Sequence, residues 1–139
     1  MPKRYLQKVQ EPGQTVNPLF TFLGVKVEMI SREKVVLALP LRDEFIQGAG
    51  VIAGGVMAAL ADEAMAHITL ANLNEGETTA TIEMNMRYLT SIKKGELRAV
   101  ATLVKKGRRV VTVKAEVVDD QGGLLGQAGA SFMVIERKE

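Results

Sequence analysis

Hydrophobic and polar residues follow two different patterns along this chain, and each pattern predicts one kind of element. Residues 47–72 are apolar almost all round, which is typical of a long helix that a sheet buries. Residues 78–89 alternate with a period of two, which predicts a strand. We expect one face of this strand to carry Ala80, Ile82, Met84, Met86 and Tyr88, and the other face to carry Thr79, Thr81, Glu83, Asn85 and Arg87.

Further strands are predicted at residues 25–30, 34–41, 97–105, 109–119 and 124–135. The segment 34–41 is apolar on both faces, so both faces should be covered, and Pro40 marks its end or an edge position. The short turn 106–108 predicts a hairpin between its neighbouring strands. The last strand has a run of small residues that indicates close packing against it: Gly126, Ala128, Gly129 and Ala130.

The N-terminal part of the chain predicts little regular structure. Residues 1–16 are polar and are expected to form a mobile lead-in. Asn17 can then cap a short helix that starts at Pro18 and ends at Gly24. We expect one or two helical turns with four apolar side chains facing inward, namely Leu19, Phe20, Phe22 and Leu23.

The order of elements predicts an α+β fold in one domain over residues 17–139. One long helix is followed directly by four strands, which argues against a repeated strand–helix–strand unit. Short connections favour an antiparallel sheet, and we expect six strands curled around the helix. A chain of 139 residues is long enough to bury a core of this kind.

Composition excludes several classes of chemistry. The net charge is +2 and the basic residues are scattered, which argues against a nucleic-acid partner. The chain has no cysteine and one histidine, which argues against a thiolate nucleophile or a cysteine or multi-histidine metal site. Because no stretch resembles a signal peptide or a membrane span of ~20 apolar residues, we expect a cytoplasmic protein without membrane contact.

A glycine-rich turn precedes the long helix, with Gly48, Gly50, Gly54 and Gly55 inside eight residues. The first N–H groups of a helix have no partner inside it, and the helix dipole adds about half a positive charge there. Such a site can bind a phosphate or polarise a carbonyl oxygen, and a preorganised donor of this kind lowers a barrier by roughly 3 kcal/mol. The alternative is a tight turn that lets the helix pack closely on the sheet.

Asp62 and Glu63 are the acidic residues between positions 51 and 72. Asp62 lies seven residues after Gly55 and returns to the same helical face, among Ala58, Ala59, Met65 and Ala66. A carboxylate there is costly unless it is paired, exposed or used in chemistry, and partial burial would raise its pKa toward that of a useful base. The alternative is a solvated carboxylate, or one paired with Arg87.

Three further features have a functional and a structural interpretation. Glu63 points about 100° away from Asp62, which favours a structural or solvated role. His67 lies on a different face from Asp62, and we expect a helix histidine with a satisfied nitrogen. The last feature is a compact basic turn, which is either a solvated hairpin or a clamp for the phosphates of a nucleotide-bearing substrate: Lys105, Lys106, Gly107, Arg108 and Arg109.

Together these residues resemble the hotdog-fold acyl-CoA thioesterases, most closely the phenylacetate-pathway type. The family pattern is Asn-x-x-Gly-x-x-His-Gly-Gly, followed by a helix with Asp eight residues after the first glycine of the final pair. Here the stretch runs from Gln47 through Ala53 to Gly54 and Gly55, and the aspartate is Asp62. The resemblance covers about residues 17–135 and fits the order of the predicted elements.

The resemblance implies that two chains pair their sheets edge to edge, that dimers form a homotetramer, and that the active sites lie at the dimer interface. It implies that the Gly54 N–H, with Gly55 beside it at the substrate, holds the thioester carbonyl. Asp62 would reach in from the partner chain and activate a water or attack the carbonyl itself. Thr81 matches a hydroxyl that helps to place the water, and residues 105–109 would lie near the phosphates of coenzyme A.

Two positions depart from the family pattern: Gln47 replaces the asparagine and Ala53 replaces the histidine. Gln47 keeps an amide that can bind the carbonyl or a water, whereas Ala53 removes a side chain that usually shapes the site. The resulting hypothesis is hydrolysis of an acyl-CoA, with no metal and no cofactor beyond the coenzyme A of the substrate. The alternatives are a noncatalytic acyl-CoA-binding or sensing protein, and a hydratase or dehydratase, which would need a histidine that this loop lacks.

Overall fold

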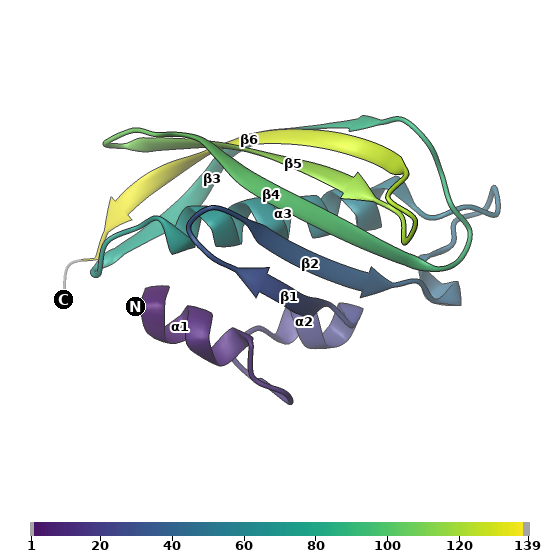
Figure 1. The fold of residues 1–139 in the computed structure, drawn as a ribbon, viewed down its shortest axis with the longest axis horizontal. Coiled ribbons are helices and arrows are strands. Elements are labelled where there is room, and N and C mark those ends of the chain that lie inside the picture. Colours follow the sequence, from purple (N-terminus) through teal and green to yellow (C-terminus); the bar gives the residue numbers. More distant parts are fainter. Residues whose placement is uncertain (1, 138–139) are drawn as a thin grey trace.

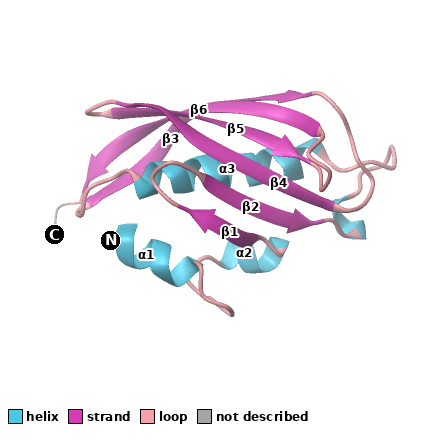
Figure 2. Cartoon of the chain, in the orientation of Figure 1, coloured by secondary structure: helices cyan, strands magenta, loops and turns pink. Residues whose placement is uncertain are grey.

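The computed structural model describes residues 2–137 as a curved sheet with a long helix on its concave side (Figures 1 and 2). The elements are α1 (Pro2–Val9), α2 (Pro18–Leu23), β1 (Lys26–Ile30), β2 (Val35–Pro40), the 3-10 turn η1 (Asp43–Phe45), α3 (Gly54–Ala71), β3 (Glu77–Tyr88), β4 (Glu96–Lys106), β5 (Val110–Val118) and β6 (Leu124–Glu136). The predicted α+β class, the long helix and the six strands are confirmed.

The sheet has the strand order β1-β2-β4-β5-β6-β3, and every neighbouring pair is antiparallel. Its concave face packs on one side of α3, where Met57, Leu60 and Met65 are buried. Full burial of such a side chain contributes about 1.5–3 kcal/mol, so this contact holds the helix in the sheet. The strands β1 and β3 are the two edges, and β3 is the longer of them.

Close packing on β6 and the burial of β2 follow the sequence-based expectations. Four residues of β2 are buried, from both of its faces, and Pro40 is its last residue. A Cβ at Gly126 in β6 would lie 2.6 Å from Cε of Met86 and 3.2 Å from Sδ of Met57. Glycine is therefore favoured at position 126, because a side chain there would displace the end of Met86.

The N-terminus differs from the expected mobile lead-in, because residues 2–9 form α1 and pack against α3. The Tyr5 hydroxyl lies 2.8 Å from Nε2 of His67, and Asn17 Nδ2 donates to the same hydroxyl over 2.8 Å. Val9, four residues after Tyr5, is buried in the core. Since residues four apart share a helical face, these two side chains turn a mostly polar segment into a packed helix.

The short helix α2 has the predicted caps but a narrower buried face. Asn17 accepts a hydrogen bond from the Phe20 N–H, and Gly24 ends the helix at φ +85°. Phe20 and Leu23 are buried, as expected. Two side chains expected to face inward do not: Leu19 is 43% exposed and Phe22 is 69% exposed. Positions 20 and 23 are three apart and lie on one face, while their neighbours turn outward.

A β-bulge in β3 overturns the expected alternation of its faces. The ladder pairs Thr81 with the buried Phe132 and Met84 with the buried Ala130, and the register shifts between Thr81 and Glu83. Since paired residues share a face, Thr81 lies on the concave side together with Met84. Thr79 also moves to the concave side, and Ala80, paired with the exposed Met133, moves to the convex side.

Candidate functional site

A tight turn leads the chain into α3. The N–H of Gln47 donates to Val51 O over 2.9 Å, and the Gly50 N–H donates to Gln47 O over 2.9 Å. Gly50 has φ +84°, a conformation that favours glycine. The Ala53 N–H is bonded to Phe45 O at 2.8 Å, so the residue before the helix is fixed as well. The glycine turn therefore holds the start of α3 in one position.

The first turn of α3 presents backbone donors. No acceptor within residues 2–137 receives the N–H of Gly54 or of Gly55, and Ala53 provides no side-chain cap. The Gly54 carbonyl, in contrast, accepts a hydrogen bond from the Tyr88 hydroxyl at 2.8 Å. A Cβ at Gly54 would lie 3.1–3.3 Å from atoms of the Tyr88 side chain. Glycine thus allows the ring to lie directly on the helix start, beside donors that favour a negative charge.

A cavity of about 360 Å³ opens at this helix start. It brings together Gln47 and Gly54, two of the residues that the sequence singles out. The Oε1 atom of Gln47 accepts the Ala49 N–H of its own turn. The cavity is lined by Gln47, Val51, Ile52, Gly54, Met57, Tyr88, Leu89, Thr90 and Ser91.

Asp62 lies on the side of α3 that the sheet leaves partly uncovered, next to the small residues Ala58, Ala59 and Ala66. Its Oδ1 atom is buried and has no hydrogen-bond partner among the described residues. None of the ion pairs in that part of the chain involves Asp62, so the expected alternative of a pair with Arg87 is not formed. Burial without a partner raises the pKa of Asp62 above its ordinary value.

The neighbouring polar groups of α3 are held by α1 and α2. His67 Nδ1 lies 2.6 Å from Glu63 O and must donate to it, so Nε2 accepts the Tyr5 O–H. Burial lowers the pKa of His67, which keeps the ring neutral. The prediction of a satisfied helix histidine is confirmed. Burial and, after it, the nearby Asp62 raise the pKa of Glu63, which the Asn17 side chain lowers.

Gly54 and Asp62 are not brought together within one chain. They are eight residues apart on α3, which corresponds to about 12 Å along the helix axis. A carbonyl group at the Gly54 N–H is therefore too far from Asp62 of the same chain for a direct attack. Thr81 lies on the concave side of the edge strand β3, exposed, and does not line the cavity at Gly54.

The basic turn between β4 and β5 forms a separate surface. The Gly107 N–H donates to Val110 O over 2.9 Å, and a Cβ at Gly107 would lie 2.5 Å from that same oxygen, so the turn requires glycine. An open cavity of about 480 Å³ is lined by Lys105, Gly107, Arg108, Arg109, Val110 and Thr112. Among residues 2–137 no carboxylate pairs with the four cations of this turn, which leaves them available to an anion.

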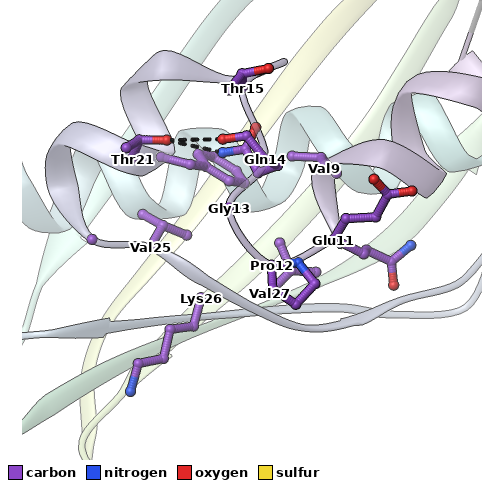
Figure 3. A pocket seen from close by; sticks show the side chains of 13 residues that line it. Val9, Glu11, Pro12, Gly13, Gln14, Thr15, Thr21, Val25, Lys26 and Val27 are labelled. Carbon is purple, nitrogen blue, oxygen red and sulfur yellow. Dashed lines mark hydrogen bonds between the residues drawn. The ribbon is translucent and has the colours of Figure 1, made fainter.

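A further cavity of about 500 Å³ lies between the α1–α2 connection and β1 (Figure 3). None of the residues singled out for chemistry lines it. Gln14 donates from Nε2 to Asn17 O and to Thr21 Oγ1, so the polar groups on this wall of the cavity already have hydrogen-bond partners within the chain. We therefore place the candidate site at the start of α3.

Residues 2–137 contain neither a cluster of metal ligands nor a membrane-spanning helix. No three His, Cys, Asp or Glu side chains gather as a metal site would require. No helix in the described part of the chain is long and apolar enough to cross a membrane.

Residues 49–125, more than half of the chain, match the sequence profile of the Thioesterase superfamily. The chain belongs to this superfamily. The match includes Gly54, Asp62, Thr81 and the basic turn, and it begins two residues after Gln47. The curved antiparallel sheet around one long helix is the hotdog fold that the resemblance predicts.

Individual relatives agree with this assignment. A protein of Saccharolobus solfataricus that is provisionally named an esterase is 25% identical, over 96% of this chain and 94% of its own. The 1,4-dihydroxy-2-naphthoyl-CoA hydrolase of Listeria monocytogenes is 23% identical, over 84% and 95%. A mutant of the phenylacetic acid degradation protein PaaI of Thermus thermophilus has a TM-score of 0.78 at 25% identity, over 84% and 98%.

One residue of the site has no signal in the local sequence. Tyr88 ends β3, and alternation alone assigns it to a strand face. Its contact with Gly54 spans 34 positions and depends on how β3 lies beside the start of α3.

Proposed function

We propose that this member of the thioesterase superfamily hydrolyses acyl-CoA thioesters. The observation that carries the proposal is the buried, unpaired Oδ1 of Asp62 on the uncovered side of α3. An aspartate without a partner and with a raised pKa is suited to accept a proton or to attack an electrophile. The Listeria monocytogenes relative, named as a hydrolase of a CoA thioester, supports coenzyme A as the thiol component.

The proposed reaction starts with water beside Asp62. The carboxylate accepts a proton while the water oxygen bonds to the thioester carbonyl carbon, and the carbonyl electron pair moves to oxygen. The N–H of Gly54 holds this oxyanion. Collapse of the intermediate breaks the C–S bond, and the thiolate of coenzyme A leaves with its electron pair. Because a thiolate is a good leaving group, the reaction needs no strong general acid.

Asp62 can instead attack the carbonyl carbon directly. The C–S bond then breaks to give a mixed anhydride with the Asp62 carboxylate, and water hydrolyses this anhydride to free acid and carboxylate. Both routes use the same two groups and have the same products.

We propose that each site is shared between two chains, with Gly54 from one and Asp62 from the other. The separation of about 12 Å along α3 supports this arrangement, because one chain cannot place both groups on one carbonyl. Two copies would pair through the outer side of β3, which pairs with no strand among residues 2–137, and dimers would form a tetramer.

The remaining site residues have supporting roles in this proposal. Gln47 would bind the carbonyl oxygen or the water, and the Gly55 N–H would face the substrate beside Gly54. Thr81 would place the water from the concave side of β3. The cations of the basic turn would bind the phosphates of coenzyme A.

The first experiment measures thiol release from a panel of acyl-CoAs, for wild type and for Asp62→Asn. We expect turnover by wild type and a loss of about 10²–10⁴-fold in the variant, with the variant folded and still able to bind coenzyme A. Binding of every acyl-CoA without turnover by wild type would refute hydrolysis. That result would favour the noncatalytic binding protein, for which the engaged Oε1 of Gln47 is the supporting observation.

A second experiment tests the shared site. Asp62→Asn and Gly54→Ala chains are refolded separately and as an equal mixture. Mixed dimers contain one site with both native groups, so we expect the mixture to regain up to about a quarter of wild-type turnover. A mixture no more active than its components would refute sharing, and light scattering on the same samples shows whether dimers or tetramers are present.

A further inference from the structure

One wall of the cavity at the start of α3 has no part in the proposed chemistry, and this wall is the Tyr88 side chain. Its hydroxyl donates to Gly54 O over 2.8 Å, and two of its ring atoms lie 3.1 and 3.2 Å from the position of a Gly54 Cβ. Gly54, at whose N–H the proposed function places the thioester carbonyl, lines the same cavity. Whatever group is attached to that carbonyl therefore lies close to the Tyr88 ring.

The structure fixes the direction of Tyr88 from both sides. Tyr88 lies on the concave face with Met84 and Met86, and the ladder pairs it with Gly126 of β6. Gly126 has no side chain, and a Cβ there would lie 2.6 Å from Cε of Met86. The hydroxyl of Tyr88 is hydrogen-bonded to the carbonyl of Gly54, the first residue of α3. The ring is thus anchored at its hydroxyl and at its backbone and spans the gap between β3 and the helix.

The walls of this cavity differ in what stands behind them. Ile52 and Met57 are 4% and 2% exposed and are backed by the core, so they cannot recede from a larger occupant. Tyr88 is 52% exposed in the single chain and is not backed by the core. Shortening Tyr88 consequently removes a wall without opening a hole in the core. The size of residue 88 therefore decides how much room exists beside Gly54.

We infer that Tyr88 sets the upper size limit of the acyl group that the enzyme accepts. This inference rests on the proposed thioester hydrolysis and adds a specificity-determining residue to it. The cavity volume of about 360 Å³ is small enough for one side chain to matter. Polar residues line part of this cavity, but its apolar side chains can contact a hydrocarbon group, so extra carbons bind better where they reach Val51, Ile52, Met57 or Leu89.

A graded series at position 88 tests the inference. The measured quantity is kcat/KM for acetyl-, butyryl-, hexanoyl-, octanoyl- and decanoyl-CoA. We expect the preferred chain length to shorten in Tyr88→Trp and to lengthen in Tyr88→Leu and further in Tyr88→Ala. If two additional methylenes fit, the ratio of kcat/KM for the longer over the shorter chain rises by about tenfold.

Tyr88→Phe separates the ring from the hydroxyl. The ring volume is unchanged while the bond to Gly54 O is lost, so we expect the wild-type chain-length preference. A preference in Tyr88→Phe that moves as far as that of Tyr88→Ala would overturn a limit set by ring size. Arg87→Ala is the matched control, because Arg87 is exposed on the convex face of the same strand and should leave the preference unchanged.

The outcomes separate this inference from the proposed function. Wild-type turnover with the same preference in folded Tyr88→Leu and Tyr88→Ala would overturn the role of Tyr88 and leave hydrolysis intact. Absence of wild-type turnover on every acyl-CoA would refute the proposed function and this inference with it. Circular dichroism of each variant confirms folding, and Tyr88→Leu serves if Tyr88→Ala does not fold.

Discussion

The Tyr5 hydroxyl donates a hydrogen bond of 2.8 Å to Nε2 of His67 and thereby joins α1 to the buried length of α3. The same hydroxyl accepts the Asn17 Nδ2 bond from the residue that caps α2. Three helices therefore meet at one oxygen atom. His67 also contacts Glu63 O, next to Asp62 on α3, so this junction supports the part of the helix that carries the proposed catalytic carboxylate.

Tyr5→Phe should destabilise the protein by about 1–2 kcal/mol, because it leaves buried His67 without a donor and Asn17 without an acceptor. The ring contact with His67 is kept, so the loss reports the hydroxyl. Urea unfolding of wild type and variant measures the difference. Gln7→Ala, an exposed change on the same helix, is the control, and equal midpoints for Tyr5→Phe and Gln7→Ala would contradict the role of the hydroxyl.

Asp62→Asn should make the protein more stable at pH 7 while it lowers turnover by about 10²–10⁴-fold. The folded pKa of Asp62 lies above its ordinary value of 3.8, so the folded state holds its proton more tightly than the unfolded state. The associated stability is present below pH 3.8 and is lost as the pH rises through the folded pKa. Ionised Asp62 therefore destabilises the folded state at pH 7, and the uncharged asparagine removes this destabilisation.

The measurement is the thermal midpoint of both proteins between pH 4 and pH 8. The difference between variant and wild type should grow as the pH rises and then level off once Asp62 is ionised. Glu75→Gln, a change at an exposed carboxylate, is the control and should show little difference. A wild type more stable than Asp62→Asn at pH 7 would mean that the carboxylate has a stabilising partner.

Gly54→Ala and Gly55→Ala should show whether the contact of Gly54 with Tyr88 matters for activity, as distinct from having glycine in the first turn of α3. A Cβ at position 54 meets the Tyr88 side chain at 3.1–3.3 Å, whereas a Cβ at position 55 meets no atom within 4 Å. We expect Gly54→Ala to displace the ring and to lower kcat/KM by up to about 100-fold, because the added methyl group shifts the N–H that holds the oxyanion. Gly55→Ala should gain about 0.4–1 kcal/mol of stability from lower chain entropy.

The two variants are compared by thermal unfolding and by kcat/KM on the same acyl-CoA. Both keep the backbone N–H, so a difference between them comes from the added methyl group. Gly55→Ala should lose less activity than Gly54→Ala. Equal losses in both would show that the Tyr88 contact is not the cause.

How well the sequence predicts a feature of this structure depends on how far apart in the sequence the interacting residues lie. Local patterns correctly predict α3, six strands and the Asn17 cap, because periodicity and caps involve residues within a few positions. The packing of α1 was not predicted, since the Tyr5–His67 contact spans 62 positions. The bulge after Thr81 was also missed, because an alternating pattern contains no mark of an extra residue that only the partner strand β6 reveals.

The candidate site divides in the same way. Gly54 and Asp62 stand out in sequence because a glycine turn and an acidic residue interrupt an apolar helix. Tyr88 carries no such mark, since its role depends on β3 ending over the first turn of α3. The bulge also corrects the position of Thr81, which the alternating pattern placed on the face opposite Met84 and which lies on the concave side.

The basic turn provides the last prediction, because its cations face an open cavity without carboxylate partners in the described chain. Arg108→Ala with Arg109→Ala should raise KM for acyl-CoA by about 2- to 30-fold, the range for two exposed ion pairs, and leave kcat nearly unchanged. The effect should shrink as salt is added, because exposed charges are screened.

An acyl thioester of N-acetylcysteamine, which lacks the phosphates of coenzyme A, is the matched substrate for this test. Wild type and the double variant should hydrolyse it with the same KM, since the cations have no phosphate to bind. A KM that rises equally for both substrates would show that the turn acts on the acyl site through the fold. A KM unchanged for acyl-CoA would mean that the turn is a solvated hairpin, and the phosphates would then have to bind elsewhere on the protein.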